Sequence, residues 1–94
     1  MGEALHHFGQ RIQDAPEDSW AWHGRGDALQ LMGEHAAALD AYQRAVEISE
    51  NVGLHHGGVA NALESLNRKS EAETHWKRAL ELDPGLTWMR QNRL

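Results

Sequence analysis

The chain has 94 residues, 40% of them hydrophobic, and a formal net charge of −5 at pH 7. This length suffices for one small domain with a core and leaves little room for a catalytic domain besides. The negative charge disfavours nucleic acid as a partner, because phosphates are bound by clustered lysine and arginine. The sequence has no apolar run of about 18 residues that would span a membrane, no signal-peptide pattern and no cysteine. We therefore expect a cytoplasmic protein.

The charge is unevenly distributed along the chain. Residues 1–50 carry a net charge of −6, whereas residues 51–94 carry +1. An acidic first half would suit a basic partner. Solvated helix faces that happen to be acidic explain the same distribution without any partner.

Helical patterns follow one another along the whole chain, separated by short breaks. They predict helices over residues 3–13, 19–32, 35–48, 54–66, 70–82 and 86–92. The third stretch shows the spacing most clearly, with apolar residues at steps of three and four: Leu39, Tyr42, Ala45 and Val46. Pro16, Gly33 and the Asp83–Pro84 pair mark breaks between helices. Such short turns place neighbouring helices antiparallel.

The helical stretches repeat with an offset of 34 residues. The segment "ALDAYQRAVEI" from Ala38 returns as "AETHWKRALEL" from Ala72, and a fainter copy, "ALHHFGQRIQD", begins at Ala4. Small residues align with small ones and large with large, which identifies an internal repeat. Tyr42 aligns with Trp76, and we expect both side chains to fill the space between a repeat and its successor.

Each period resembles the tetratricopeptide repeat pattern W-x2-L-G-x2-Y…A-x3-F…P. The first copy comprises Trp22, Arg25, Gly26, Leu29, Ala38, Tyr42 and Ala45, and the second His56, Val59, Ala60, Leu63, Ala72, Trp76, Ala79 and Pro84. The resemblance implies an all-α, right-handed α-solenoid of antiparallel helix pairs, in a single domain over residues 1–94. Its expected parts are 3–13, the second helix of a partial repeat; 19–52 and 53–86, two full repeats; and 87–94, the start of a further or capping helix.

The helix expected over residues 54–66 departs most from this pattern. His56 stands where the pattern has tryptophan, and Gly57 and Gly58 lower the intrinsic helix propensity. We expect this helix to be the weakest of the chain, to be ordered only from Val59 onward, and to open first. Gly58→Ala is expected to stabilise it, provided that Gly58 has helical backbone angles.

No constellation in the sequence points to catalysis. There is no cysteine, and no G-x-S-x-G motif surrounds a serine. No two histidines stand three or four residues apart, the spacing that places two metal ligands on one helix face; they are His6, His7, His23, His35, His55, His56 and His75. We therefore expect no enzymatic activity, no cofactor and no metal. A histidine-based metal binder is an alternative.

In the tetratricopeptide family, the first helix of each repeat lines a concave groove that holds a peptide of a partner protein. Carried through the 34-residue offset, the resemblance implies these partner-binding residues: Trp20, His23, Asp27, Gln30, Asn61, Glu64 and Trp88. An amide such as that of Asn61 can both donate to and accept from a peptide backbone. Alternatively, Trp20 packs against Ile12, and Gln30 and Asn61 are merely solvated.

Some family members bind the acidic C-terminal tail of chaperones with lysine, arginine and asparagine on this face. No lysine or arginine stands at the corresponding positions here, and Asp27 would repel a carboxylate. We expect a different ligand class for this chain, a neutral or basic peptide.

The sequence thus predicts a non-catalytic protein–protein interaction module that binds a partner protein or peptide, and neither nucleic acid nor membrane. An alternative is a regulatory or scaffold segment of a larger enzyme or assembly. The two end segments are complementary halves of a repeat with apolar surface. We therefore expect mostly monomer, with weak head-to-tail self-association.

Overall fold

The computed structural model describes residues 18–91, and every element in that range is helical. The elements are α2 (Ser19–Leu31), α3 (His35–Ile48), α4 (Gly53–Ser65), α5 (Lys69–Leu82), the 3₁₀ turn η1 (Pro84–Leu86) and α6 (Thr87–Gln91). The four long helices agree with the predicted ones to within one residue at each end. The helix predicted over 3–13 lies outside the described residues. None of the described helices is long and apolar enough to cross a membrane.

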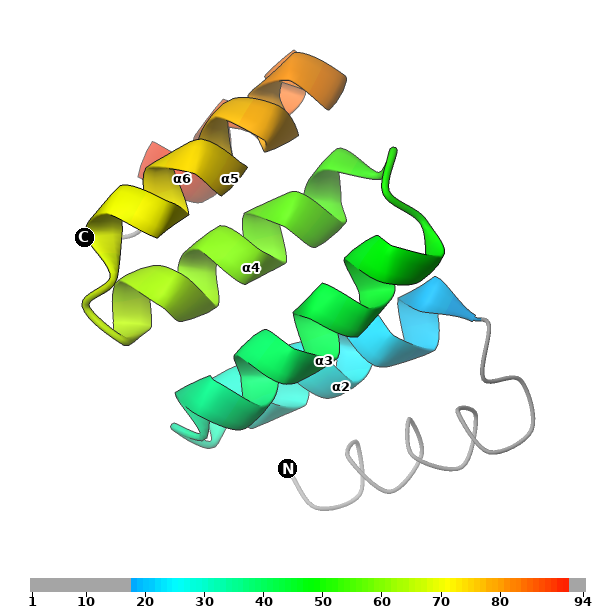
Figure 1. Ribbon diagram of the computed structural model, residues 1–94, viewed down its shortest axis with the longest axis vertical. Coiled ribbons are helices and arrows are strands. Elements are labelled where there is room, and N and C mark those ends of the chain that lie inside the picture. The colour runs from blue at the N-terminus through cyan, green and yellow to red at the C-terminus, as the bar shows by residue number, and fades with distance from the viewer. Residues whose placement is uncertain (1–17, 92–94) are drawn as a thin grey trace.

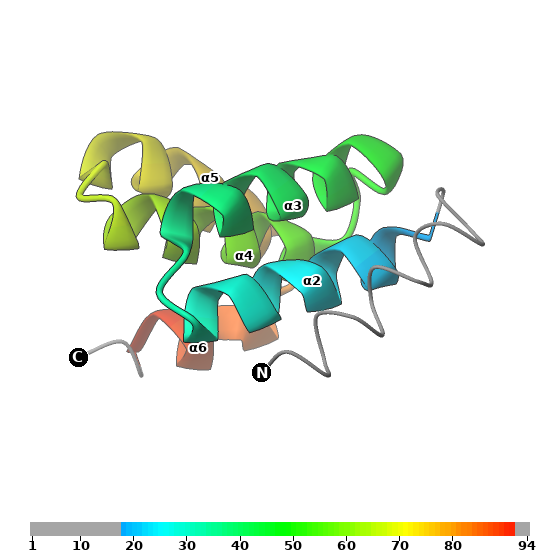
Figure 2. The same cartoon turned by 90° about the horizontal axis from the view of Figure 1, so that it is seen from below.

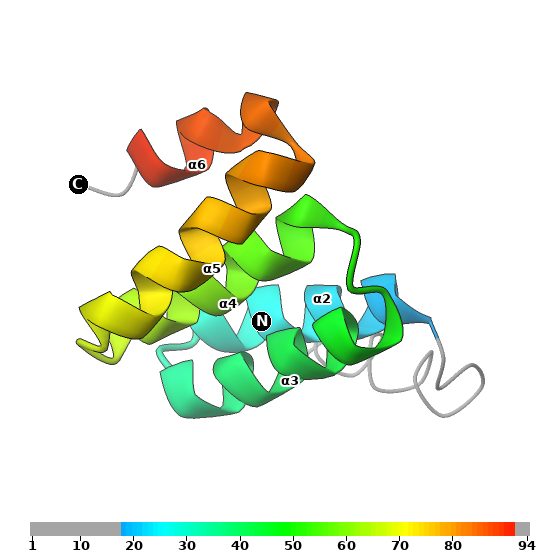
Figure 3. The ribbon, with the colours of Figure 1, turned by 45° about the horizontal axis from the view of Figure 1, so that its top comes forward.

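The helices form two antiparallel pairs, α2 with α3 and α4 with α5, and the second pair stacks on the first through α4 (Figure 1). Seen from below, α3 and α5 run along the upper side, whereas α2 and α6 lie along the lower side (Figure 2). Figure 3 shows the succession from α2 and α3, through α4 and α5, to α6. The predicted α-solenoid of helix pairs is confirmed.

The same turn closes both helix pairs. Gly33 and Asn67, 34 residues apart, adopt left-handed backbone angles with φ of 82° and 65°. After each, the next amide donates back to a carbonyl in the preceding helix, Glu34 to Leu29 at 2.9 Å and Arg68 to Leu63 at 2.8 Å. This is the Schellman ending of a helix, which favours glycine or asparagine at the left-handed position. The equivalence confirms the 34-residue register in the backbone.

Tyr42 of α3 occupies the centre of the stack and is 2% exposed. Its ring lies between Gly26 of α2 and Gly58 of α4, where a Cβ atom would fall 2.6 Å and 2.5 Å from ring carbons. Both glycines are therefore required for the helices to approach the ring. Trp76, the equivalent residue of α5, is 1% exposed and lies against α4 near Gly57. The predicted role of Tyr42 between a repeat and its successor is confirmed.

One expectation for α4 is wrong, and the structure reverses the prediction made for Gly58→Ala. The helix is ordered from Gly53, not from Val59, and residues 55–60 are all buried. The glycines at its start permit close packing: a Cβ on Gly53 would lie 2.8 Å from the carbonyl oxygen of Ala79. Gly58→Ala places a methyl group against the wedged Tyr42 ring, so it is expected to destabilise the fold. Tertiary packing outweighs the low helix propensity that motivated both expectations.

Candidate functional site

The seven predicted partner-binding residues lie on α2, α4 and α6, which are consecutive neighbours in the stack. We call the side of these three helices that carries them the first-helix face. Asp18 caps α2, its carboxylate accepting hydrogen bonds from the amides of Trp20 at 3.0 Å and Ala21 at 3.3 Å. From that start, the steps of three and four residues from Trp20 place the α2 members on one side of the helix. They are Trp20, His23, Asp27 and Gln30.

These seven residues fall into three groups by solvent exposure. Trp20 and Trp88 are 50% and 55% exposed, large values for indole side chains. Asp27 is also exposed, and three others are partly buried: Gln30, Asn61 and Glu64. His23 is only 7% exposed. It therefore lies beneath the first-helix face, and sequence spacing alone does not reveal this.

The acidic members of the first-helix face are held by aromatic donors from the second helix of their own pair. The Tyr42 hydroxyl donates to Asp27 Oδ1 at 2.5 Å, and Trp76 Nε1 donates to Glu64 Oε2 at 2.5 Å. Although Tyr42 and Trp76 are equivalent in the repeat, Asp27 and Glu64 are not. Each buried ring thus fixes one carboxylate at the surface. In the 34-residue register the carboxylate of the second repeat comes three residues later than that of the first.

Burial and the carboxylate of Asp27 both raise the pKa of Tyr42 above its usual value. The phenol therefore stays protonated and remains a donor to Asp27.

A polar link between side chains joins the two repeats near the C-terminal end of α2. Gln30 Nε2 donates to Ser65 Oγ at 3.2 Å, and Gln30 Oε1 lies 2.6 Å from Nδ1 of His35.

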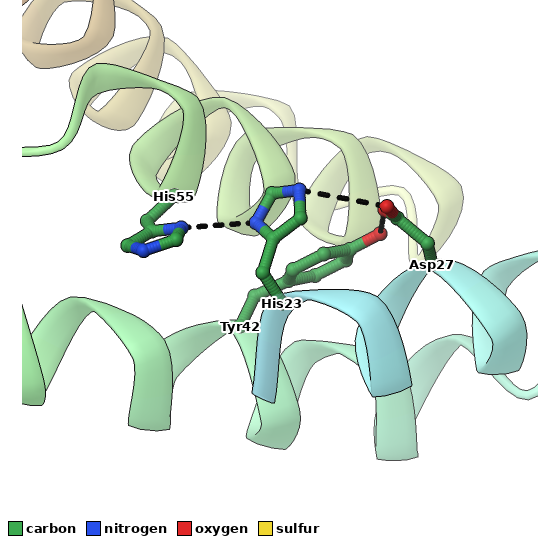
Figure 4. A network of polar contacts seen from close by, with 4 residues as sticks. All are labelled: His23, Asp27, Tyr42 and His55. Carbon is green, nitrogen blue, oxygen red and sulfur yellow. Dashed lines mark hydrogen bonds and ion pairs between the residues drawn. The ribbon is translucent and has the colours of Figure 1, made fainter. Parts of the chain in front are cut away.

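A buried pair of histidines joins α2 to α4 (Figure 4). Nδ1 of His23 lies 3.0 Å from Nδ1 of His55, whose Nε2 lies 3.1 Å from the hydroxyl of Ser19. On the opposite side, His23 Nε2 lies 3.6 Å from Asp27 Oδ2. The indole of Trp20 packs over both rings, with centroid separations of 5.7 Å to His23 and 4.5 Å to His55.

Burial lowers the pKa of both histidines. The pKa of His55 falls to about 4, through burial first and then the neighbouring His23 and His56. The pKa of His23 is also lowered by burial, and Asp27 partly opposes that effect. Both rings are therefore neutral at pH 7.

Sequence reasoning missed this pair because its members are 32 residues apart and occupy non-equivalent positions of the repeat. In the 34-residue register, His23 matches Gly57, His55 matches Ala21 and Ser19 matches Gly53. The available signal was a set of polar residues where the other repeat has glycine or alanine.

A second histidine pair lies on the far side of α4. His56 Nε2 donates to the carbonyl oxygen of Glu50 at 2.8 Å, and its ring stacks on that of His75 at 5.8 Å. His56 Nδ1 is buried and has no hydrogen-bond partner among the described residues. Within residues 18–91, no three histidine, aspartate or glutamate side chains come together as a metal site would require.

The model of the tetratricopeptide repeat family matches residues 17–84. The chain belongs to the tetratricopeptide repeat family. It is 28% identical to the small glutamine-rich tetratricopeptide repeat-containing protein 2 of Mycosarcoma maydis, over 88% of this chain and 24% of that protein. It is 43% identical to human tetratricopeptide repeat protein 36, over 52% of this chain and 26% of that protein.

Solved structures of MamA share the fold of this tetratricopeptide repeat chain. One AMB-1 structure superposes with a TM-score of 0.81 at 28% identity, over 89% of this chain and 50% of MamA. An MSR-1 structure gives 0.81 at 26% identity, over 88% and 48%. The chain thus spans about a quarter of the length of its sequence relatives and about half that of MamA.

Proposed function

We propose that this tetratricopeptide repeat chain is a non-catalytic interaction module that binds a peptide of a partner protein across the first-helix face. The observation that carries the proposal is the pair of carboxylates, Asp27 and Glu64, held at that face by buried aromatic donors. They accompany two half-exposed indoles, those of Trp20 and Trp88. Family membership supports a protein partner, since such repeats typically mediate protein–protein interaction.

The negative charge of the first-helix face favours a neutral or basic peptide. Helix α4 contains no lysine or arginine, and the single arginine of α2, Arg25, lines a recess against α3. An acidic peptide would meet the negative charge of Asp27, which is exposed on this face. A lysine or arginine of the partner would instead pair with Asp27 and lie against an indole face.

The remaining members of the first-helix face suit the backbone of an extended or helical peptide. The amides of Gln30 and Asn61 can donate and accept. His23 contributes from beneath, by supporting Trp20. Two repeats offer a small contact area, so the affinity is expected to be weak.

The test is a chemical-shift titration of the isotope-labelled chain with two pools of ten-residue peptides. The pools have the same apolar positions and differ only in carrying lysine or glutamate elsewhere. We expect shifts on α2, α4 and α6 with the lysine pool and none with the glutamate pool. Shifts confined to α3 and α5, around Tyr42 and Trp76, or equal responses to both pools, would contradict the proposal.

A matched pair of variants tests the role of charge. Asp27→Asn keeps an oxygen that accepts from Tyr42 but removes one of the two negative charges that Asp27 and Glu64 bring to the first-helix face. Asp40→Asn makes the same change on α3, where Asp40 is exposed. The first substitution is expected to weaken binding of the lysine pool several-fold, and the second to leave it unchanged.

A further inference from the structure

Four polar groups form a continuous chain between α2 and α4: the Asp27 carboxylate, the His23 and His55 rings, and the Ser19 hydroxyl (Figure 4 shows the first three). His55 is 0%, Ser19 6% and His23 7% exposed. Buried polar groups must satisfy one another when water does not. The two facing Nδ1 atoms, 3.0 Å apart, can do so only if one carries a hydrogen and the other does not.

The carboxylate of Asp27 fixes the direction of this chain. Asp27 accepts the Tyr42 hydroxyl at Oδ1 and can only accept at Oδ2, so the hydrogen of neutral His23 is on Nε2. His23 Nδ1 is then bare and accepts from Nδ1–H of His55. His55 Nε2 is bare in turn and accepts from the Ser19 hydroxyl. In this order each polar atom faces one of opposite hydrogen-bonding character, with His23 Nε2–H directed at the charged carboxylate 3.6 Å away. The reverse order sets a lone pair of His23 against that carboxylate.

We propose that His23 and His55 act as one proton-binding site at the α2–α4 junction. With no added proton, or with one, the two rings stay in contact and the two repeats stay joined. With two added protons, the junction opens. The first proton enters at Nε2 of His55, where the Ser19 hydroxyl turns to accept. The hydrogen on His55 Nδ1 then passes to His23 Nδ1. The added charge thereby comes to rest on His23 beside Asp27, and His55 is neutral again with its hydrogen on Nε2.

A second proton has no comparable binding position beside a carboxylate. It would have to bind at His55 Nδ1, facing the N–H of a cationic His23 with no acceptor between them. Two donors and two positive charges at this separation repel each other in a buried setting. The contact between the rings therefore breaks, and α2 and α4 separate locally.

The surrounding groups favour the same sequence of events. Helix α2 contributes one negative charge, Asp27, next to His23. Helix α3 contributes Tyr42, whose ring packs on His23 at 5.1 Å and stays protonated because its pKa is raised. Helix α4 contributes His56, which lowers the pKa of His55. From α5, His75 with Glu71 beside it meets His56, beyond the pair itself.

Opening of the junction would act on the first-helix face through Trp20. The Trp20 indole packs over both rings, so it loses its support when they separate. One of the two exposed indoles of the face would then change position with pH. The junction inference itself does not depend on the proposed peptide function.

The decisive measurement is nitrogen NMR of the imidazole rings in the full chain, with the Trp20 indole N–H peak followed in parallel. At pH 7.5 we expect the hydrogen on Nδ1 of His55 and on Nε2 of His23. On acidification we expect the two rings to take up a single proton first, with the Trp20 peak unbroadened. Uptake of the second should shift the Trp20 peak. Independent titration of both rings near pH 6.5, or His55 carrying its hydrogen on Nε2 at pH 7.5, would overturn the proposal.

Variants separate proton binding from simple packing. Asp27→Asn removes the charge that holds the first proton and should weaken its binding at least about tenfold, the usual effect of a carboxylate at this range. His35→Gln, on α3 and outside the pair, is the control and should leave both titrations unchanged. If Asp27→Asn lowers stability but leaves the titration of the pair as in the original chain, the proposal fails. The tautomers, the two-step proton uptake and the Trp20 response of the unmodified chain decide the proposal even if a variant does not fold.

Discussion

At the scale of single residues, the glycines around Tyr42 matter more than their low helix propensity suggests. Gly26 and Gly58 face the same ring from α2 and α4, so the ring occupies space that a methyl group would need. Propensity treats Gly58 as a weak point of an isolated helix, whereas its environment makes the missing side chain a requirement.

Gly58→Ala is therefore expected to destabilise the chain by about 1–3 kcal/mol through overpacking. Urea unfolding of the two chains gives the difference. Introducing the same change into a Tyr42→Leu chain serves as the control, because a more flexible side chain can give way and the cost should shrink. A gain in stability of about 1 kcal/mol, as helix propensity alone predicts, would contradict the contact with Tyr42.

At the scale of elements, the sequence predicted the four long helices well because each carries a clear apolar period between recognisable breaks. Gly33 marked the first turn directly. The expectation that α4 is ordered only from Val59 is wrong because burial of Gly53, His55 and Gly57 against neighbouring helices is invisible in a local pattern. The first-helix face followed from the 34-residue register. The histidine pair did not, because its two members come from different helices at non-equivalent positions.

Among the described helices, α6 rather than α4 is expected to open first. It has five residues, too few for a stable isolated helix, and depends on Leu86 in the core and on Met89 against Gly57. Amide hydrogen exchange should show α6 exchanging fastest and residues 55–60 of α4 protected to a degree similar to α3. Faster exchange at residues 55–60 than in α6 would restore the original expectation for α4.

At the scale of the whole molecule, the histidine pair makes stability depend on pH. In the unfolded chain His55 binds a proton near pH 6.5, but in the fold its pKa is about 4. Above pH 6.5 neither state is protonated at His55, and its effect on stability is absent. Between pH 6.5 and 4 the unfolded chain binds more protons, so the free energy of unfolding falls as the pH falls.

Urea unfolding at a series of pH values is expected to show this loss, which for His55 amounts to at most about 3.5 kcal/mol, since one pKa unit corresponds to about 1.4 kcal/mol. Below about pH 4 the folded chain also binds this proton, with the α2–α4 junction open as proposed above, and His55 contributes no further loss. His55→Gln should flatten the profile between pH 6.5 and 4, and His35→Gln should leave it as it is. An unchanged profile in His55→Gln would mean that other groups produce the acid sensitivity.

The link between His23 and His55 also fixes the order in which the two helix pairs follow each other. In a stack of equivalent units, any unit could succeed any other, because each meets only its neighbours. Here, inserting a copy of either pair between them would leave a buried imidazole facing glycine or alanine, with its nitrogens unsatisfied. The polar chain from Asp27 to Ser19 thus makes this junction specific. Only a following helix pair with a histidine at the position of His55 completes the chain, so the order of the two pairs is defined although the architecture is repetitive.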